Sequence, residues 1–105
     1  MNRQRLPNRR PSFTTELVFE GGSYSATLGF DAHNNRIAEV FTHGAKAGSA
    51  IDRILDDACV ALSLLLQYGV EPAALASSMG RLGDGTSPAS IIGALADLIV
   101  REAQS

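Results

Sequence analysis

The sequence predicts an α+β protein, in which a three-stranded antiparallel meander is followed by three helices packed on one face of the sheet. Apolar and polar residues alternate in three consecutive segments between residues 12 and 42, which is typical of half-buried strands. Apolar residues then recur at helical spacing in three segments of the C-terminal half. Because the strands come first and the helices afterwards, we expect a βββααα two-layer sandwich.

The chain of 105 residues has the size and composition of one domain. Its hydrophobic fraction of 45% and charged fraction of 19% fit a water-soluble globular protein. No apolar run approaches the ~20 residues that a membrane-spanning helix needs, so we expect no membrane partner and a cytoplasmic location. The single cysteine, Cys59, excludes a disulfide framework and a cysteine metal cluster.

Charge is distributed unevenly along the sequence. The first ten residues hold no acidic residue and four arginines, namely Arg3, Arg5, Arg9 and Arg10, whereas the rest holds five basic and all eleven acidic residues. We therefore expect a basic flexible arm at residues 1–11 and a single domain at residues 12–105. Such an arm can bind nucleic acid or the acidic face of a sister subunit, and a solvated tail without a partner is the alternative.

The three expected strands cover residues 12–20, 23–30 and 37–42. Gly21 and Gly22 form a two-residue hairpin signal between the first two strands. Residues 31–36 are rich in Asp and Asn, which favours a second turn before the third strand. Tight connections of this kind produce an antiparallel meander with one apolar face that needs a cover.

The central element is a long helix that begins after Ser49 and ends at Gly69. Ser49 can cap its N-terminus, with Asp52 three residues on, and Gly69 suits the left-handed position after the last turn. The expected inward stripe consists of Ile51, Ile54, Leu55, Ala58, Leu62 and Leu65, and the expected opposite side of Asp52, Asp56, Ser63 and Gln67. Val60 and Leu64 add apolar surface on the flank, so we expect a homodimer or larger oligomer.

Two further helices should supply the rest of the cover. Pro72 lies in the first turn of the second helix, which we expect to continue to Met79. Residues 81–86 form a glycine-bearing loop. Ser87 then caps the last helix, with Pro88 at its first position. Its apolar face consists of Ile91, Ile92, Leu95, Leu98 and Ile99.

The sequence contains none of the short motifs of covalent catalysis or metal binding, so we expect no catalytic site, no metal and no cofactor. One loop at a helix start combines features that attract anions. They are two glycines (Gly44 and Gly48), the cation of Lys46 and the hydroxyl of Ser49, with His43 beside them. The expected ligand is a phosphate of a nucleotide or nucleic acid. A tight passage from strand to helix without a ligand is the alternative.

With these residues identified, the sequence resembles the TSCPD-type domain at the C-terminal end of cobalamin-dependent (class II) ribonucleotide reductases. The matching segments are RLPNRR, GGSYSATLGF, AEVF and KAGSAIDRILDDACVALSLLLQYGVEP, and the resemblance covers roughly residues 5–79. The most specific part is the helix end at Gln67, Tyr68, Gly69 and Val70. The resemblance implies an association with deoxyribonucleotide synthesis.

The chain departs from the complete enzyme in ways that bear on activity. The reductase barrel, with its radical cysteine, redox cysteine pair and cobalamin site, has no counterpart, and Thr86-Ser87-Pro88 lacks the cysteine of the signature that names the domain. No catalytic residue is therefore carried over. The resemblance carries over only Lys46, Gly48 and Ser49 in the loop and Arg9 and Arg10 in the arm.

These observations favour a stand-alone, non-catalytic domain that acts as a binding or assembly module, with a ribonucleotide reductase chain as a candidate partner. Two alternatives stay open. The chain can be an auxiliary component of a ribonucleoside-diphosphate reductase supplied in trans, which leaves open whether it counts as part of an enzyme. It can also be a small nucleic-acid-binding protein that uses the arginine arm.

Overall fold

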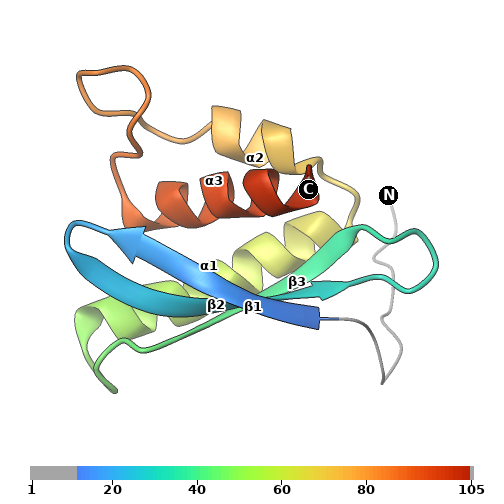
Figure 1. Ribbon diagram of the computed structural model, residues 1–105, viewed down its shortest axis with the longest axis horizontal. Helices are drawn as coiled ribbons and strands as arrows, with labels where there is room; N and C mark the ends of the chain where they lie inside the picture. Colours follow the sequence, from blue (N-terminus) through green and yellow to red (C-terminus); the bar gives the residue numbers. More distant parts are fainter. Residues whose placement is uncertain (1–11, 105) are drawn as a thin grey trace.

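A computed structural model describes residues 12–104 and has the expected α+β architecture (Figure 1). Strands β1 (Ser12–Phe19), β2 (Gly22–Phe30) and β3 (Ile37–His43) form an antiparallel sheet in the order β1-β2-β3. Helices α1 (Ala50–Gln67), α2 (Pro72–Ser77) and α3 (Ile91–Ala103) follow. α1 packs along β3, α3 lies against β1, and α2 packs on α3. The predicted βββααα order is therefore confirmed.

The core lies between the sheet and the helices. Its largest fully buried side chains come from all three strands and from two helices: Leu17, Leu28, Val40, Leu55, Leu95, Leu98 and Ile99. The other face of the sheet is largely polar, and there the hydroxyls of Thr14 and Thr27 are hydrogen-bonded across the strands at 2.8 Å. A sheet with one apolar and one polar face is the arrangement that the alternating sequence predicts.

The first hairpin turn differs from the prediction by one residue. Its two central residues are Glu20 and Gly21, with φ of 48° and 79°, and Gly22 already belongs to β2, where it pairs with Phe19. Gly22 serves a packing purpose instead, because a Cβ at this position would lie 2.7 Å from the hydroxyl oxygen of Tyr24. The expected Gly21–Gly22 turn is therefore wrong, and the second glycine makes room for an aromatic ring.

Both ends of α1 follow the sequence signals. The hydroxyl of Ser49 accepts a hydrogen bond from the backbone N–H of Asp52 at 3.2 Å. Gly69 has φ of 94°, and the N–H of Val70 donates to the carbonyl of Leu65 at 3.0 Å. This is the hydrogen bond of a Schellman motif, in which a left-handed residue ends the helix.

The inward side of α1 is rotated relative to the predicted stripe. The buried residues are Leu55, Ala58, Cys59, Leu62, Leu66 and Gln67. Ile51, Ile54 and Leu65 were expected inside, yet each is 36–44% exposed. The reason is that α1 packs along β3, the outer strand of the sheet, so the polar side chains of Ser63 and Gln67 face the strand instead of solvent.

The two C-terminal helices begin and end differently from the prediction. α2 ends at Ser77, two residues before Met79. The cap of α3 is Ser90, whose hydroxyl accepts from the N–H of Gly93 at 3.0 Å, and not Ser87. Ser87 is held in the preceding loop by Asp84, and Pro88 forms an isolated bridge with Arg81. These loop hydrogen bonds delay the start of the helix.

An ion pair fixes that loop to the helical layer. The guanidinium of Arg81 makes two hydrogen bonds to the carboxylate of Asp97 on α3, at 2.6 and 2.8 Å, and these lower the pKa of Asp97. Within the loop, the hydroxyl and N–H of Ser87 and the N–H of Thr86 lower the pKa of Asp84 to about 2. The loop after α2 is thus an ordered connection.

Candidate functional site

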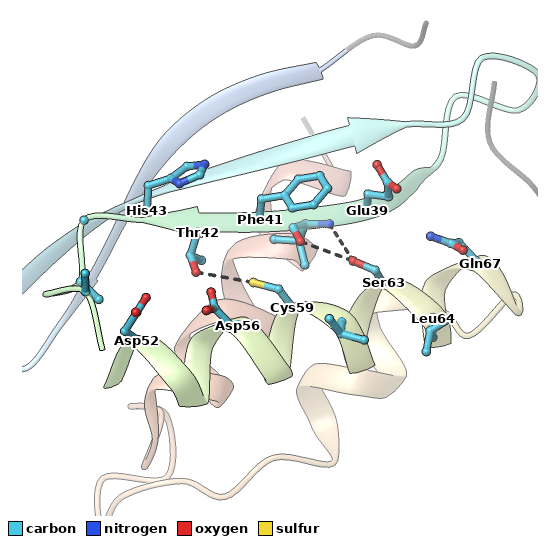
Figure 2. Close-up of a pocket in the computed structure, with 15 residues that line it drawn as sticks. Glu39, Phe41, Thr42, His43, Asp52, Asp56, Cys59, Ser63, Leu64 and Gln67 are labelled. Atoms are coloured by element: carbon cyan, nitrogen blue, oxygen red, sulfur yellow. Dashed lines mark hydrogen bonds between the residues drawn. The ribbon is translucent and has the colours of Figure 1, made fainter. Parts of the chain in front are cut away.

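A groove lies between the outer edge of β3 and α1 (Figure 2). It has a volume of about 750 Å³ and runs from Glu39 and Gln67 at one end to Gly44 and Asp52 at the other. Glu39, Phe41 and His43 stand on one side of the strand, whereas Thr42 points toward the helix. A shallow channel beside an outer strand is a place where another chain can bind.

Side chains of α1 cover the edge of β3 at the floor of this groove. The hydroxyl of Ser63 accepts from the backbone N–H of Val40 at 3.0 Å, and the side-chain amide of Gln67 donates to the carbonyl of Ala38 at 3.1 Å. These hydrogen bonds occupy backbone groups with which a further strand would pair. The groove therefore suits a ligand that is recognised through side chains more than one that extends the sheet.

Cys59 lies in the same floor. Its sulfur is 3.6 Å from the hydroxyl oxygen of Thr42, and the residue is 6% exposed. Burial raises the pKa of the Cys59 thiol, and the carboxylate of Asp56 acts in the same direction. A thiol with a raised pKa is a poor nucleophile at neutral pH, so Cys59 acts here as a small buried side chain.

The walls of the groove combine apolar surface with negative charge. Phe41 is 47% exposed and Val60 61% exposed, and Leu64 lies beside them. Asp52 and Asp56 line the groove from α1, and Glu39 lines it from β3. Among the described residues that form this lining there is no lysine or arginine. The surface therefore favours a partner that brings both apolar and basic groups.

The structure places His43 at the end of β3 and the other predicted anion-binding residues in the short connection from β3 to α1. His43 and Gly44 line one end of the groove, and Lys46 is exposed. The N–H of Gly48 donates to the carboxylate of Asp52 at 2.9 Å, so an acidic side chain already uses this donor. Gly44 has φ of 106°, a conformation that favours glycine, which also fits the tight-passage alternative. Anion binding by this loop stays a prediction.

The arginines of the predicted arm, Arg3, Arg5, Arg9 and Arg10, lie outside the described residues. Between residues 12 and 104, no group of three or more His, Cys, Asp and Glu side chains is arranged to hold a metal ion. No helix in this range is long and apolar enough to cross a membrane.

Two groove residues were assigned to the wrong side of α1 from sequence. Ser63 and Gln67 were expected opposite the apolar stripe, and both instead hydrogen-bond to the backbone of β3. Their spacing of four residues, in step with Cys59, is the signal that places all three on one side of the helix. A polar residue on the core-facing side of a helix indicates that an outer strand lies nearby, with backbone N–H or C=O groups that need hydrogen-bond partners.

Comparison with known proteins links the chain to one group. The TSCPD domain family model matches residues 2–102. The vitamin B12-dependent ribonucleotide reductase of Agrobacterium fabrum is 35% identical over 68 residues, which cover 65% of this chain and 5% of that enzyme. The enzyme of the same name from Streptantibioticus cattleyicolor is also 35% identical over 68 residues, which cover 65% of this chain and 11% of that enzyme. The chain thus spans a small part of these curated relatives, and no solved structure matches it significantly.

Proposed function

Because this chain belongs to the TSCPD domain family, we propose that it is a non-catalytic binding and assembly module of deoxyribonucleotide metabolism. Its proposed partner is a chain of a vitamin B12-dependent ribonucleotide reductase, the class of enzyme to which the curated relatives belong. The groove between β3 and α1 is the docking site. The observation that carries this proposal is the combination of exposed apolar and acidic side chains around that groove.

The chemistry of the walls specifies the segment that docks. Phe41 and Val60 expose apolar area to water, and burial of this area against a partner makes the free energy of binding more favourable. Asp52 and Asp56 attract lysine and arginine side chains at the same surface, which increases the rate of encounter and selects the partner. The bound reductase segment therefore contains apolar residues flanked by basic ones.

The first prediction is that Val60→Lys weakens binding of the reductase by at least tenfold, or about 1.4 kcal/mol. The change removes apolar contact and places a positive charge where a basic segment docks. Val18→Lys is the matched control, because Val18 is 58% exposed on β1 and does not line the groove, whereas Val60 is 61% exposed.

Binding is measured by surface plasmon resonance with the full chain immobilised and the reductase of the same organism in solution. The control should bind as the wild type does. The proposal fails if the wild type does not bind at a concentration of about 100 μM, near the weak end of specific association. It also fails if the Val60 and Val18 variants bind equally well.

A further inference from the structure

We propose that the basic arm, residues 1–11, docks in the groove between β3 and α1 of its own chain. These residues lie outside the part of the chain that the structure describes. The TSCPD family model nevertheless begins its match at residue 2 and continues to residue 102. The arm therefore belongs to the region that the family model covers, together with the strands and helices around the groove.

Charge is the first feature that pairs the arm with this groove. Three carboxylates line the groove, those of Glu39, Asp52 and Asp56, and its described lining contains no lysine or arginine. In Figure 2 the carboxylates of Asp52 and Asp56 point from α1 toward β3. The arm contains four arginines and no acidic residue. Opposite charges on two facing surfaces select the partner and speed its encounter.

A second groove, beside the start of β1, is less suited to the same segment. Ser12, Glu71 and Glu102 line it, but so does Arg36. The guanidinium of Arg36 donates a hydrogen bond to the carboxylate of Glu71 at 2.9 Å. A basic segment would meet this cation there, next to a carboxylate that it already neutralises. The groove between β3 and α1 has the larger excess of negative charge in its lining.

The register of the sheet places the arm within reach of the groove. Ser12, the first residue of β1, pairs with Gly29 of β2, which pairs in turn with Glu39 of β3. Two strand spacings, or about 10 Å, therefore separate the start of β1 from the Glu39 end of the groove. A segment of the length of the arm spans up to about 36 Å when extended, so about 26 Å remains after this crossing. This exceeds the roughly 14 Å of β3 between Glu39 and His43.

The order of residues in the arm matches the walls of the groove. Leu6 follows Arg5 and precedes Arg9 and Arg10, so an apolar side chain is flanked by cations on both sides. The groove offers exposed apolar area, such as the ring of Phe41, between its carboxylates. The arm therefore has the composition that these walls favour in a ligand.

Proline favours docking beside β3 over addition of a strand to the sheet. Pro7 and Pro11 have no N–H group to donate to a neighbouring strand. On the other side of the contact, Ser63 and Gln67 already hydrogen-bond to backbone groups of β3. Both partners are thus suited to a contact that is made through side chains.

The contact is expected to be reversible. Exposed ion pairs contribute about 0.2–1 kcal/mol each, and attachment to β1 gives the arm an effective concentration of about millimolar at the groove. A partner of the same composition would therefore compete with the arm. Docking of the arm does not depend on the reductase proposal, and its tests contain only this chain. The failure of either proposal can therefore be recognised separately.

The position of the arm is tested with a nitroxide spin label on Gln4→Cys in the full chain. Cys59→Ala removes the native thiol, and Cys59→Ser replaces it if circular dichroism shows that Cys59→Ala is unfolded. We expect the amide NMR signals of Phe41 and Val60 to lose most of their intensity. The signal of Val18, which does not line the groove, should keep its intensity. Equal losses at the three positions would overturn the proposal, as would the strongest losses at the second groove.

A mixed sample distinguishes docking within one chain from docking on a second copy. Spin-labelled chains without ¹⁵N are mixed with ¹⁵N-labelled chains that carry no spin label. We expect the groove signals of the ¹⁵N chains to keep their intensity. A loss as large as in the singly labelled protein would place the arm in the groove of another molecule, and docking within one chain would then be wrong.

A matched pair of substitutions tests the role of the acidic wall. Asp56 and Asp57 are adjacent exposed residues of α1, but only Asp56 lines the groove. Asp56→Lys should restore the intensity of the groove signals in the spin-labelled chain, whereas Asp57→Lys should leave them broadened. Raising the salt concentration from about 0.1 to about 1 M, which shortens the screening length from about 10 to about 3 Å, should also restore them. Broadening that survives both Asp56→Lys and high salt would contradict docking by charge.

Discussion

Leu95→Ala should lower the free energy of unfolding by about 2–5 kcal/mol, the range for deletion of a buried leucine side chain. Leu95 is 0% exposed and lies on α3 in the core between the sheet and the helices. The loss comes from apolar area that is no longer buried and from a cavity that the surrounding side chains fill only in part. A domain of this size has a total stability of about 5–15 kcal/mol, so the loss is a large fraction of it.

The measurement is urea denaturation followed by circular dichroism, with the free energy extrapolated to water. Leu82→Ala is the matched control, because Leu82 is 55% exposed in the loop after α2. The control should change stability by less than about 0.5 kcal/mol, as most surface substitutions do. Equal losses for the two variants would contradict the assignment of α3 to the core.

Ser63→Ala should cost about 1–3 kcal/mol, the penalty for leaving a partly buried backbone group without its hydrogen-bond partner. The hydroxyl of Ser63 accepts from the N–H of Val40 at 3.0 Å and donates to the carbonyl of the same residue at 3.4 Å. Both groups lie on the outer edge of β3. Without the hydroxyl, this edge becomes available to a strand of another molecule, so we also expect slow aggregation.

Ser77→Ala is the control for this substitution, because Ser77 is exposed on α2 and its hydroxyl reaches only the carbonyl of Ala74 within the same helix. Urea denaturation measures the stability difference, and light scattering over several days measures aggregation. Ser63→Thr keeps a hydroxyl and should retain part of the stability. If Ser63→Ala is as stable as the control, the hydroxyl does not protect the edge of β3.

Local patterns in the sequence predicted the elements and several of their ends. Alternation gave the three strands, and Ser49 and Gly69 marked the two ends of α1, because capping depends on neighbours within a few residues. The cap of α3 was misassigned to Ser87, since both Ser87 and Ser90 are capping residues. The choice between them depends on Arg81 and Asp84, through hydrogen bonds that are made only after the loop has folded.

The groove could be predicted only in part. The flank formed by Val60 and Leu64 was identified from sequence as surplus apolar surface, and both residues line the groove. The facing wall of Phe41 and Glu39 was not identified, because it depends on how α1 lies against β3. The same position of the helix explains why Ile54 and Leu65, at regular helical spacing, are on the surface.

The position of Cys59 also gives the protein a built-in reporter of local opening. The thiol is 6% exposed beneath Thr42, and it is the single thiol of the chain. The thiol faces the floor of the groove and is mostly buried, so a thiol-modifying reagent should react with it slowly. Separation of α1 from β3 would expose it further and speed the reaction, whereas a partner that fills the groove would slow it. The labelling rate of Cys59 therefore reports on the contact between α1 and β3 in the unaltered protein, with and without a partner.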